Sequence, residues 1–439
     1  MDDDEIERIL EKTIPENMLR RGRTTVDSLL GPVKDVLNRR QFPNKALTDL
    51  QLEMMFQLLS SLDTDKDPEA ARVGEREARV ASPFVARLSF GFNHGIGRSG
   101  KLAAPQPKAP GASQMQQVAN SVALDAIRKL GLSNVKAGLV TPLSTGMTIS
   151  LVLGALRREF GVKRVLYPRI DHTSPKRAIA LSGLEEKTIP TLIEGDTVQV
   201  DLSHLEKEMR KSESSAVLAT TTFFPPRVSD PVKDISRSCA EKDIPLIINN
   251  AYGVQSDRVM SEIRAAIDAG RVDAVVQSSD KNFLTPVGAS IVVTPSKEFT
   301  DSVADTYAGR ATAAPVAQTL AALLAIGLHT YKDLQKEQLD NKALLDERMN
   351  EIANKLGQRV LSVWNPVACA ITMDGSNVRE IGARLYNARV TGPRAIEKGA
   401  IGSSVENYPH SYIVMNAAIG ASKTDIETAT TKLYKEASK

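Results

Sequence analysis

Apolar residues recur along this chain with two different periods, and the change of period divides it into parts. In the first sixty or so residues they recur at helical spacing and form one stripe, made by Val26, Leu29, Leu30, Val33, Val36 and Leu37. A polar stretch that contains a proline, residues 63–71, follows and is typical of a linker. This pattern predicts a helical N-terminal extension over residues 1–65.

From about residue 72 to 310, short apolar runs rich in β-formers alternate with helix-like stretches. The predicted strands are residues 137–140, 164–167, 216–224, 245–248, 274–276 and 290–293, and the helices between them include 146–160 and 231–241. Such alternation predicts an α/β domain with a mainly parallel sheet, which we place at residues 66–320. A long apolar helix from residue 318 to 328 is expected to lead into a small C-terminal domain, residues 321–439.

Composition narrows the possible classes of protein. The net charge of +3 over 439 residues does not indicate a nucleic-acid binder, so any RNA contact must come from local patches. The two cysteines, Cys239 and Cys369, lie far apart, which argues against a disulfide framework, a metal site or a cysteine nucleophile. With no apolar signal core and no apolar run long enough to cross a membrane, the sequence predicts a cytoplasmic protein.

Basic residues surround the N-terminal apolar stripe, and they include Arg20, Arg21, Arg23, Lys34, Arg39 and Arg40. They are compatible with a solvated helix face, which the sequence alone favours, or with contacts to a phosphate backbone.

The run VVQSSDKNFLTPVGAS, residues 275–290, contains the strongest candidate for chemistry. Lys281 follows an apolar strand that ends in polar residues, and a partly desolvated lysine is a nucleophile that can form a Schiff base. About thirty residues earlier, the strand in PLIINNAYG ends at Asn249. A single lysine is usually a solvated charge, but these two elements in this order favour a pyridoxal phosphate (PLP) site, with one group on the ring nitrogen and one lysine on the aldehyde.

Two further strand ends offer cofactor contacts. Ser144, Thr145 and Gly146 stand between a strand and a helix, where hydroxyls and backbone N–H groups either bind an anion or simply cap the helix. With a PLP lysine elsewhere, a cup for the cofactor phosphate is favoured. His172 follows another strand end and either stacks on a ring or is a buried, hydrogen-bonded residue.

A glycine-rich loop, residues 94–113, carries a second set of polar groups: Arg98, Ser99, Gln106 and Lys108. Residues 95–100 fit GxGxxG, but no clear strand precedes them, so we reject a dinucleotide site. The loop suits a bound phosphate or is a solvated basic loop, and the sequence leaves both open. Arg76, predicted on the first turns of a helix, and Arg310 are further candidates that also suit surface salt bridges.

Taken together, these motifs are very similar to those of the O-phosphoseryl-tRNA(Sec) selenium transferase family. The matching segments span residues 73–312, with a weaker match to NAAIG at residues 416–420, and they are VGEREARV, HGIGRSGKLAAPQPKAPGAS, NSVALDAIRKLG, YPRID, NNAYGVQS, VQSSDKNFLTPVG and YAGRA. The resemblance implies a PLP-dependent enzyme of fold type I (aspartate aminotransferase-like), with a mainly parallel seven-stranded sheet and a small C-terminal α+β domain. It also implies a homotetramer.

The resemblance also implies a role for each matching residue. Lys281 corresponds to the Schiff-base lysine and Asn249 to the residue at the ring nitrogen. Ser144, Thr145, Gly146 and Arg76 correspond to contacts of the cofactor phosphate, and His172 to a contact of its ring. The residues corresponding to those that hold the substrate phosphate are Arg98, Ser99, Gln106, Lys108 and Arg310, and those in regions that contact tRNA are Lys34, Arg39 and Arg394.

The implied reaction converts phosphoserine on tRNA(Sec) to selenocysteine. Phosphate leaves the β-carbon of the substrate, and selenium from selenophosphate takes its place. Asn249 stands where most PLP enzymes have an aspartate, which implies a weaker electron sink that loss of phosphate tolerates. Two alternatives remain: another PLP enzyme acting on phosphoseryl-tRNA or phosphoserine, with a sulfur donor or as a lyase, and a non-catalytic tRNA-binding protein.

Overall fold

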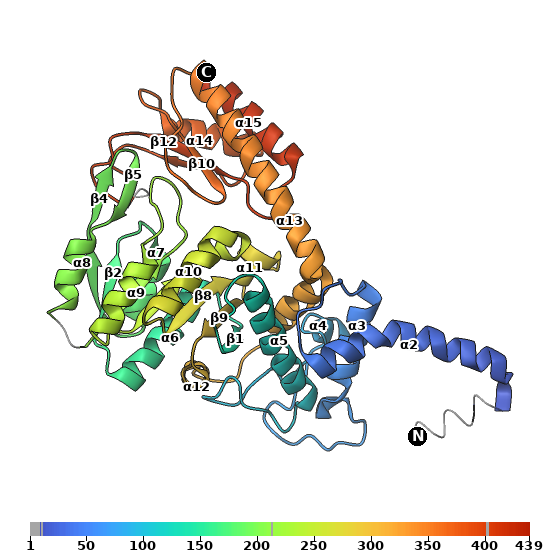
Figure 1. The fold of residues 1–439 in the computed structure, drawn as a ribbon. Helices are drawn as coiled ribbons and strands as arrows, with labels where there is room; N and C mark the ends of the chain where they lie inside the picture. Colours follow the sequence, from blue (N-terminus) through green and yellow to red (C-terminus); the bar gives the residue numbers. More distant parts are fainter. Residues whose placement is uncertain (1–8, 10–11, 212–213, 401–403) are drawn as a thin grey trace.

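A seven-stranded sheet forms the centre of the molecule in the computed structural model, which describes residues 9, 12–211, 214–400 and 404–439 (Figure 1). In spatial order its strands are β1 (Ala137–Thr141), β9 (Ser290–Thr294), β8 (Ala274–Ser278), β7 (Leu246–Asn249), β6 (Ser215–Thr220), β2 (Arg164–Pro168) and β3 (Glu185–Ile189). Neighbours are parallel except that β9 runs antiparallel to β1 and β8. The predicted α/β class and mainly parallel sheet are therefore confirmed.

The strands follow from continuous apolar runs, since a sheet covered by helices buries both faces of each strand. Every residue of β6, β7, β8 and β9 is buried. The predicted strand at 216–224 was too long, because β6 ends at Thr220, shortly before Pro225 and Pro226, which have no N–H to donate to a sheet. β3 was missed because its sequence, EEKTI, is charged and gives no apolar run. Charged residues are tolerated there because β3 is an edge strand of the sheet.

Helices cover the sheet and connect it to the rest of the chain. They include α5 (Pro110–Lys129), α6 (Thr145–Phe160), α7 (Thr173–Leu181), α9 (Val232–Glu241), α10 (Asp257–Ala269) and α12 (Lys297–Ala304). Short elements complete this part: α8 (Leu202–Met209), α11 (Ser279–Phe283), the hairpin of β4 (Thr191–Glu194) and β5 (Thr197–Val200), and the 3-10 turn η2 (Gly253–Gln255). Among the described helices, none is both long enough and apolar enough to cross a membrane.

The helix α13 (Ala314–Lys355) joins two hydrophobic cores (Figure 1). Its residues up to Tyr331 pack in the large core, and those from Leu345 pack in a second one, so the predicted boundary at residue 320 lies before this change. Gly327 has a φ of 62° inside α13, and an added Cβ would lie 2.7 Å from the backbone nitrogen of Ala46, so this bend requires glycine. The second core belongs to a three-stranded antiparallel sheet, β10 (Ala368–Thr372), β12 (Tyr412–Asn416) and β11 (Arg394–Ile396), with α14 (Val378–Asn387) and α15 (Lys423–Ala437).

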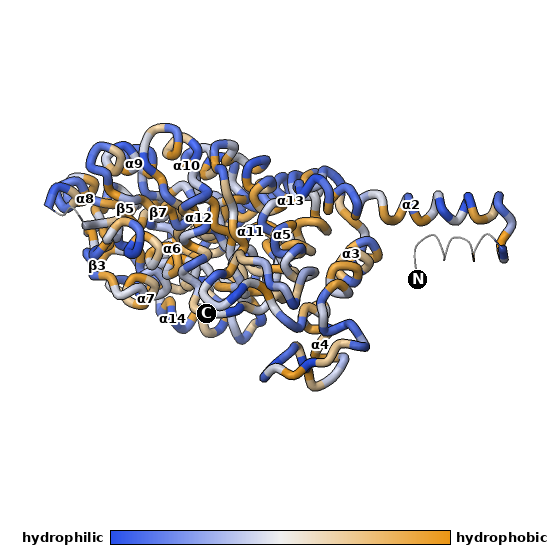
Figure 2. The backbone as a smooth tube through the Cα atoms, turned by 90° about the horizontal axis from the view of Figure 1, so that it is seen from below, coloured by the Kyte–Doolittle hydropathy of each residue, from blue (hydrophilic) through white to orange (hydrophobic). Residues whose placement is uncertain are grey.

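At the N-terminal end, α2 (Glu16–Arg39) extends away from the body of the molecule, and α3 (Asp49–Ser61) packs against that body. Both views show this arrangement (Figures 1 and 2). The helical character predicted for this region is observed over these ranges, while residues 1–8 and 10–11 of the predicted extension lie outside the described residues. In α2 the buried residues are Leu19, Val33 and Val36.

Two local predictions were wrong. Residues 63–71 are not a simple linker, because Asp63 is buried at 1% exposure and a 3-10 turn, η1 (Thr64–Lys66), follows it. Arg76 does not lie on a helix, because the next residues, Glu77 and Ala78, have φ values of 41° and 54°, in the left-handed region. The next helix along the chain is the short α4 (Pro83–Arg87).

Candidate active site

A cavity of about 420 Å³ opens at the carboxyl edge of the large sheet. Its lining includes six residues predicted from sequence: Ser144, Thr145, Gly146, His172, Asn249 and Lys281. They follow four different strands, and they meet because the carboxyl ends of parallel strands lie at one edge of the sheet. The structure therefore brings the predicted cofactor residues together, with the exception of Arg76.

Lys281 lies on the short helix α11, directly after β8. Its Nζ is 3.4 Å from Ser278 Oγ and 3.5 Å from Asp280 Oδ2. Its side chain is 49% exposed, more than the partly desolvated position expected from sequence. The amine is therefore reachable from the cavity and has an acidic neighbour that balances its charge.

Asn249 is the last residue of β7 and is 6% exposed. Its Oδ1 is buried and has no hydrogen-bond partner, whereas Oδ1 of the adjacent Asn250 accepts from the Thr221 hydroxyl at 2.8 Å. A buried acceptor without a donor costs free energy, so a ligand N–H is expected at this point. The protonated ring nitrogen of PLP supplies such a donor, and the residue therefore fits the cofactor.

The residues predicted to form the phosphate cup lie at the N-terminus and first turn of α6. The Ser144 side chain makes no capping hydrogen bond to this helix, so ordinary N-capping does not account for it. The first N–H groups of a helix have no partner within the helix, and together with the helix dipole they bind anions. Thr145 Oγ1 lies 3.4 Å from Ser290 Oγ, and a Cβ on Gly146 would lie 3.1 Å from Ser174 Oγ, so α6 approaches its neighbours closely here.

His172 stands at the N-terminus of α7, where its Nδ1 accepts a hydrogen bond from the Ser174 N–H at 3.2 Å. Because Nδ1 is an acceptor, the ring proton is assigned to Nε2. Burial lowers the pKa of His172, and the positive charges of Arg394 and Lys281 lower it further. The histidine therefore enters the cavity wall as a neutral ring, edge-on to Phe223.

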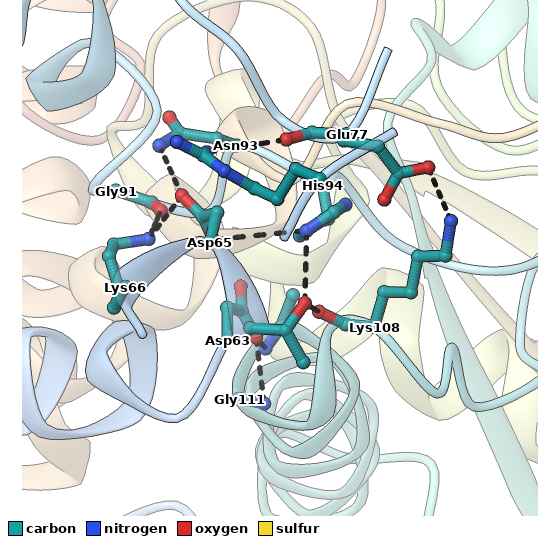
Figure 3. Close-up of polar contacts among 12 residues, drawn as sticks. Asp63, Asp65, Lys66, Glu77, Gly91, Asn93, His94, Lys108 and Gly111 are labelled. Atoms are coloured by element: carbon teal, nitrogen blue, oxygen red, sulfur yellow. Dashed lines mark hydrogen bonds and ion pairs between the residues drawn. The ribbon is translucent and has the colours of Figure 1, made fainter. Parts of the chain in front are cut away.

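None of the predicted substrate-phosphate residues lines this cavity. Arg98, Ser99 and Lys108 are exposed on the glycine-rich loop, and Lys108 is paired with Glu77 (Figure 3). Arg310 Nη2 donates to the His94 carbonyl, while Arg310 Nε is buried and has no partner. Burial lowers the pKa of Arg310, and so does the charge of Arg76, so a bound anion would stabilise this arginine.

The three residues predicted to contact tRNA lie in two places. Lys34 and Arg39 are exposed on α2, where they form solvated ion pairs with Asp27 and Asp35. Arg394 begins β11 and is half-buried, with its guanidinium carbon 4.4 Å from the ring centroid of Phe224. Arg394 Nη1 is buried without a hydrogen-bond partner. This arginine therefore stands next to two residues of the cavity wall, Phe223 and Phe224.

Sequence reasoning missed several residues of the cavity. Asp280 could have been found from its place beside Lys281, and Tyr252 from the Ala-Tyr-Gly that follows Asn249. Gln255 and Asn416 belong to the quoted segments NNAYGVQS and NAAIG, but only the fold shows that they and Phe223 reach the cavity.

Both thiols are buried away from this chemistry, and burial raises the pKa of Cys239 and that of Cys369 to about 12. Neither thiol is therefore ionised enough near neutral pH to act as a nucleophile.

A mainly parallel seven-stranded sheet with a strand-end lysine, an amide acceptor and a helix N-terminus around one cavity defines a PLP-dependent enzyme of fold type I. A structure of Oryza sativa TDC with PLP and tryptamine shares this fold, with a TM-score of 0.60 at 13% identity over 97% of this chain and 98% of that one.

Within that class, the chain belongs to the family of O-phosphoseryl-tRNA(Sec) selenium transferases, whose family model matches residues 62–438. The family member from Methanopyrus kandleri is 45% identical over 96% of this chain and 98% of its own length. The member from Dictyostelium discoideum is 33% identical over 92% of each chain. A crystal structure of an archaeal member has a TM-score of 0.94 at 43% identity and covers 96% of this chain and 98% of that chain. The resemblance noted in the sequence is confirmed.

Proposed function

We propose that this protein converts O-phosphoseryl-tRNA(Sec) to selenocysteinyl-tRNA(Sec), with PLP as cofactor and selenophosphate as selenium donor, in the cytoplasm. The observation that carries the proposal is the cavity at the carboxyl edge of the large sheet, where Lys281, Asn249 and the N-terminus of α6 offer one group each to the aldehyde, the ring nitrogen and the phosphate of PLP. Membership of a family with this activity supports the choice of substrate.

When bound, PLP withdraws electrons from the α-carbon of the substrate and so eases loss of the α-proton and then of the β-phosphate. Lys281 Nζ would take the α-proton, and the Asp280 carboxylate lies 3.5 Å from it. Asn249 orients the ring through its unpartnered Oδ1 but, being neutral, holds a ring proton less firmly than a carboxylate would. The first turn of α6, with Ser144, Thr145 and Gly146, holds the cofactor phosphate.

We further propose a homotetramer in which the predicted substrate-phosphate residues complete the cavity of a neighbouring subunit. Arg98, Ser99, Gln106, Lys108 and Arg310 would hold the phosphate of the phosphoseryl group, and Arg76 the phosphate of PLP. Support comes from their position, because none of them lines the cavity of its own chain. Arg310, with its buried and unpartnered Nε, is suited to receive an anion.

The tRNA contacts belong to the same proposal. Lys34 and Arg39 are placed on the extended helix α2, where exposed basic side chains suit the phosphates of an acceptor arm. Arg394, beside the cavity, would meet the end of the tRNA closest to the reacting group.

The test is phosphate release from phosphoseryl-tRNA(Sec), set beside free phosphoserine, with wild type, Lys281→Ala and the exposed Lys297→Ala as a matched control. Release from the charged tRNA alone, lost only in Lys281→Ala, is expected. Release from free phosphoserine would instead identify a small-molecule lyase, and release from neither would favour a non-catalytic tRNA-binding protein. Comparing selenophosphate with sulfide then identifies the donor.

A further inference from the structure

Residues 63–66 fasten both ends of the glycine-rich loop, although their sequence resembles a linker. The loop leaves the body at His94 and returns at Lys108, just before α5 begins at Pro110. Side chains from this short segment bond to residues at each of these two ends (Figure 3).

At the returning end, Asp63 and Thr64 hold the start of α5. Asp63 Oδ1 accepts from the N–H groups of Gly111 at 2.9 Å and Ala112 at 3.1 Å. Thr64 donates to the Lys108 carbonyl twice, from its N–H at 3.1 Å and from its hydroxyl at 3.0 Å. Lys108, one of the proposed phosphate residues, thus has its backbone fixed by the segment.

At the leaving end, the Asp65 carboxylate is the central group, and its side chain is 3% exposed. Its Oδ2 accepts from Asn93 Nδ2 and from Lys66 Nζ, each at 2.9 Å. Its Oδ1 has no hydrogen bond and lies 4.0 Å from Nε2 of His94, whose side chain is also 3% exposed. Lys66 Nζ also donates to the Gly91 carbonyl at 2.7 Å, so the ion pair of Asp65 and Lys66 holds the segment that enters the loop.

His94 connects this network to the proposed phosphate site. Its carbonyl accepts from Arg310 Nη2, and the neighbouring residues Ile96 and Ala311 exchange two backbone hydrogen bonds, of 2.9 and 3.2 Å. Movement of His94 would therefore move the guanidinium of Arg310 and the base of the loop together.

We propose that Asp65 is a positioning residue for the substrate phosphate, acting through His94 on Arg310 and on the loop that carries Arg98 and Ser99. Thr64 assists from the other end of the loop. The inference rests on the proposed function, in which these groups hold the phosphoryl group, and adds to it a residue that itself touches neither substrate nor cofactor.

The test uses the PLP-loaded enzyme and Asp65→Asn, which keeps the size of the side chain but removes its charge, so that the bond from Lys66 Nζ no longer joins two charged groups. Inorganic phosphate affinity is measured by calorimetry, and KM and kcat are measured by phosphate release from phosphoseryl-tRNA(Sec). Asp67→Asn is the matched control, because Asp67 follows this segment directly and is an exposed carboxylate that accepts from the nearby Glu69 N–H.

We expect Asp65→Asn to weaken phosphate binding and raise KM by about tenfold each, the effect of losing one charge-assisted hydrogen bond. The kcat and the cofactor absorbance should stay near wild type, and Asp67→Asn should match wild type throughout. Unchanged phosphate affinity and KM in folded Asp65→Asn would overturn the proposal, and so would a fall in kcat at constant KM.

If Asp65→Asn does not fold, Thr64→Val decides, because at an exposed residue it removes the hydroxyl bond to the Lys108 carbonyl and the 3.4 Å contact of that hydroxyl with His94 Nε2. We expect it to weaken phosphate binding by about threefold, and an unchanged affinity would overturn the proposal. The proposed function and the role of Asp65 are tested by different measurements. A wild type that binds phosphate but releases none from phosphoseryl-tRNA(Sec) refutes the proposed function, while the phosphate affinities still judge Asp65.

Discussion

Gln255 connects the C-terminal part of the chain to the segment that carries Lys281. Its replacement by leucine should lower the stability of the fold and the affinity for PLP. Its side chain is 3% exposed and lines the cavity. Its Oε1 accepts from the Ile419 N–H at 2.8 Å, and its Nε2 donates to the carbonyls of Tyr252 at 3.0 Å and Lys281 at 3.2 Å. Leucine has a similar volume and can make none of these bonds.

The expected loss of unfolding free energy follows from the three backbone groups that lose their side-chain partner in Gln255→Leu. A typical hydrogen bond contributes about 1 kcal/mol, and a buried partner left unsatisfied costs about 1 to 3 kcal/mol. Three such losses, partly offset by the added apolar burial of leucine, give a destabilisation of about 3 to 5 kcal/mol. Gln57→Leu, an exposed glutamine on α3, should cost less than about 0.5 kcal/mol and serves as the control.

The assay is urea unfolding at equal protein concentration, followed by far-UV circular dichroism and by fluorescence of Trp364, the single tryptophan. A second reading titrates PLP into each protein, since a loosened Lys281 should bind the cofactor more weakly. A loss of stability below about 1 kcal/mol with unchanged PLP affinity would refute the idea that Gln255 holds the lysine segment in place.

Three further perturbations test other parts of the structure. Asn249→Asp should keep PLP bound but change the rate and the ratio of phosphate released to selenocysteinyl-tRNA formed, because a carboxylate strengthens the electron sink; an unchanged rate and ratio would contradict this. Asp230→Asn leaves the guanidinium of Arg227, 1% exposed, without its charged partner and should cost about 3 to 5 kcal/mol in urea unfolding. Asp234→Asn breaks the exposed pair of the same spacing and should cost less than about 1 kcal/mol, so equal losses would count against the role of burial. Burial raises the pKa of Asp63 from 3.8 to about 6, so between these two pH values the folded state binds a proton that the unfolded state has lost. The stabilisation is present in acid and is lost as the pH rises through about 6, so the stability of wild type relative to Asp63→Asn should fall between pH 4 and 7; a constant difference would show that this carboxyl does not titrate as stated.

Much of the cofactor site was predictable because its residues follow strands that the sequence reveals. The runs at 245–248 and 274–276 are continuously apolar, so Asn249 and Lys281 could be assigned to the ends of buried strands. Parallel strands place such ends at one edge, which brings Ser144 and His172 there as well. The errors fall where local pattern is weak, as with the charged strand β3 and with the turn after Arg76.

By itself, the sequence determined the mainly parallel α/β sheet, the strand-end lysine and the family, because hydrophobic period and local motifs are properties of neighbouring residues. Only the tertiary structure decided that Asp63 and Asp65 are buried and fasten the glycine-rich loop, since their partners lie 28 to 49 residues away in sequence. It also decided that Gln255 reaches Ile419, 164 residues on, and that Arg310 and its loop lie outside the cavity of their own chain. Burial and long-range hydrogen bonds depend on how the whole chain packs, and no local pattern records them.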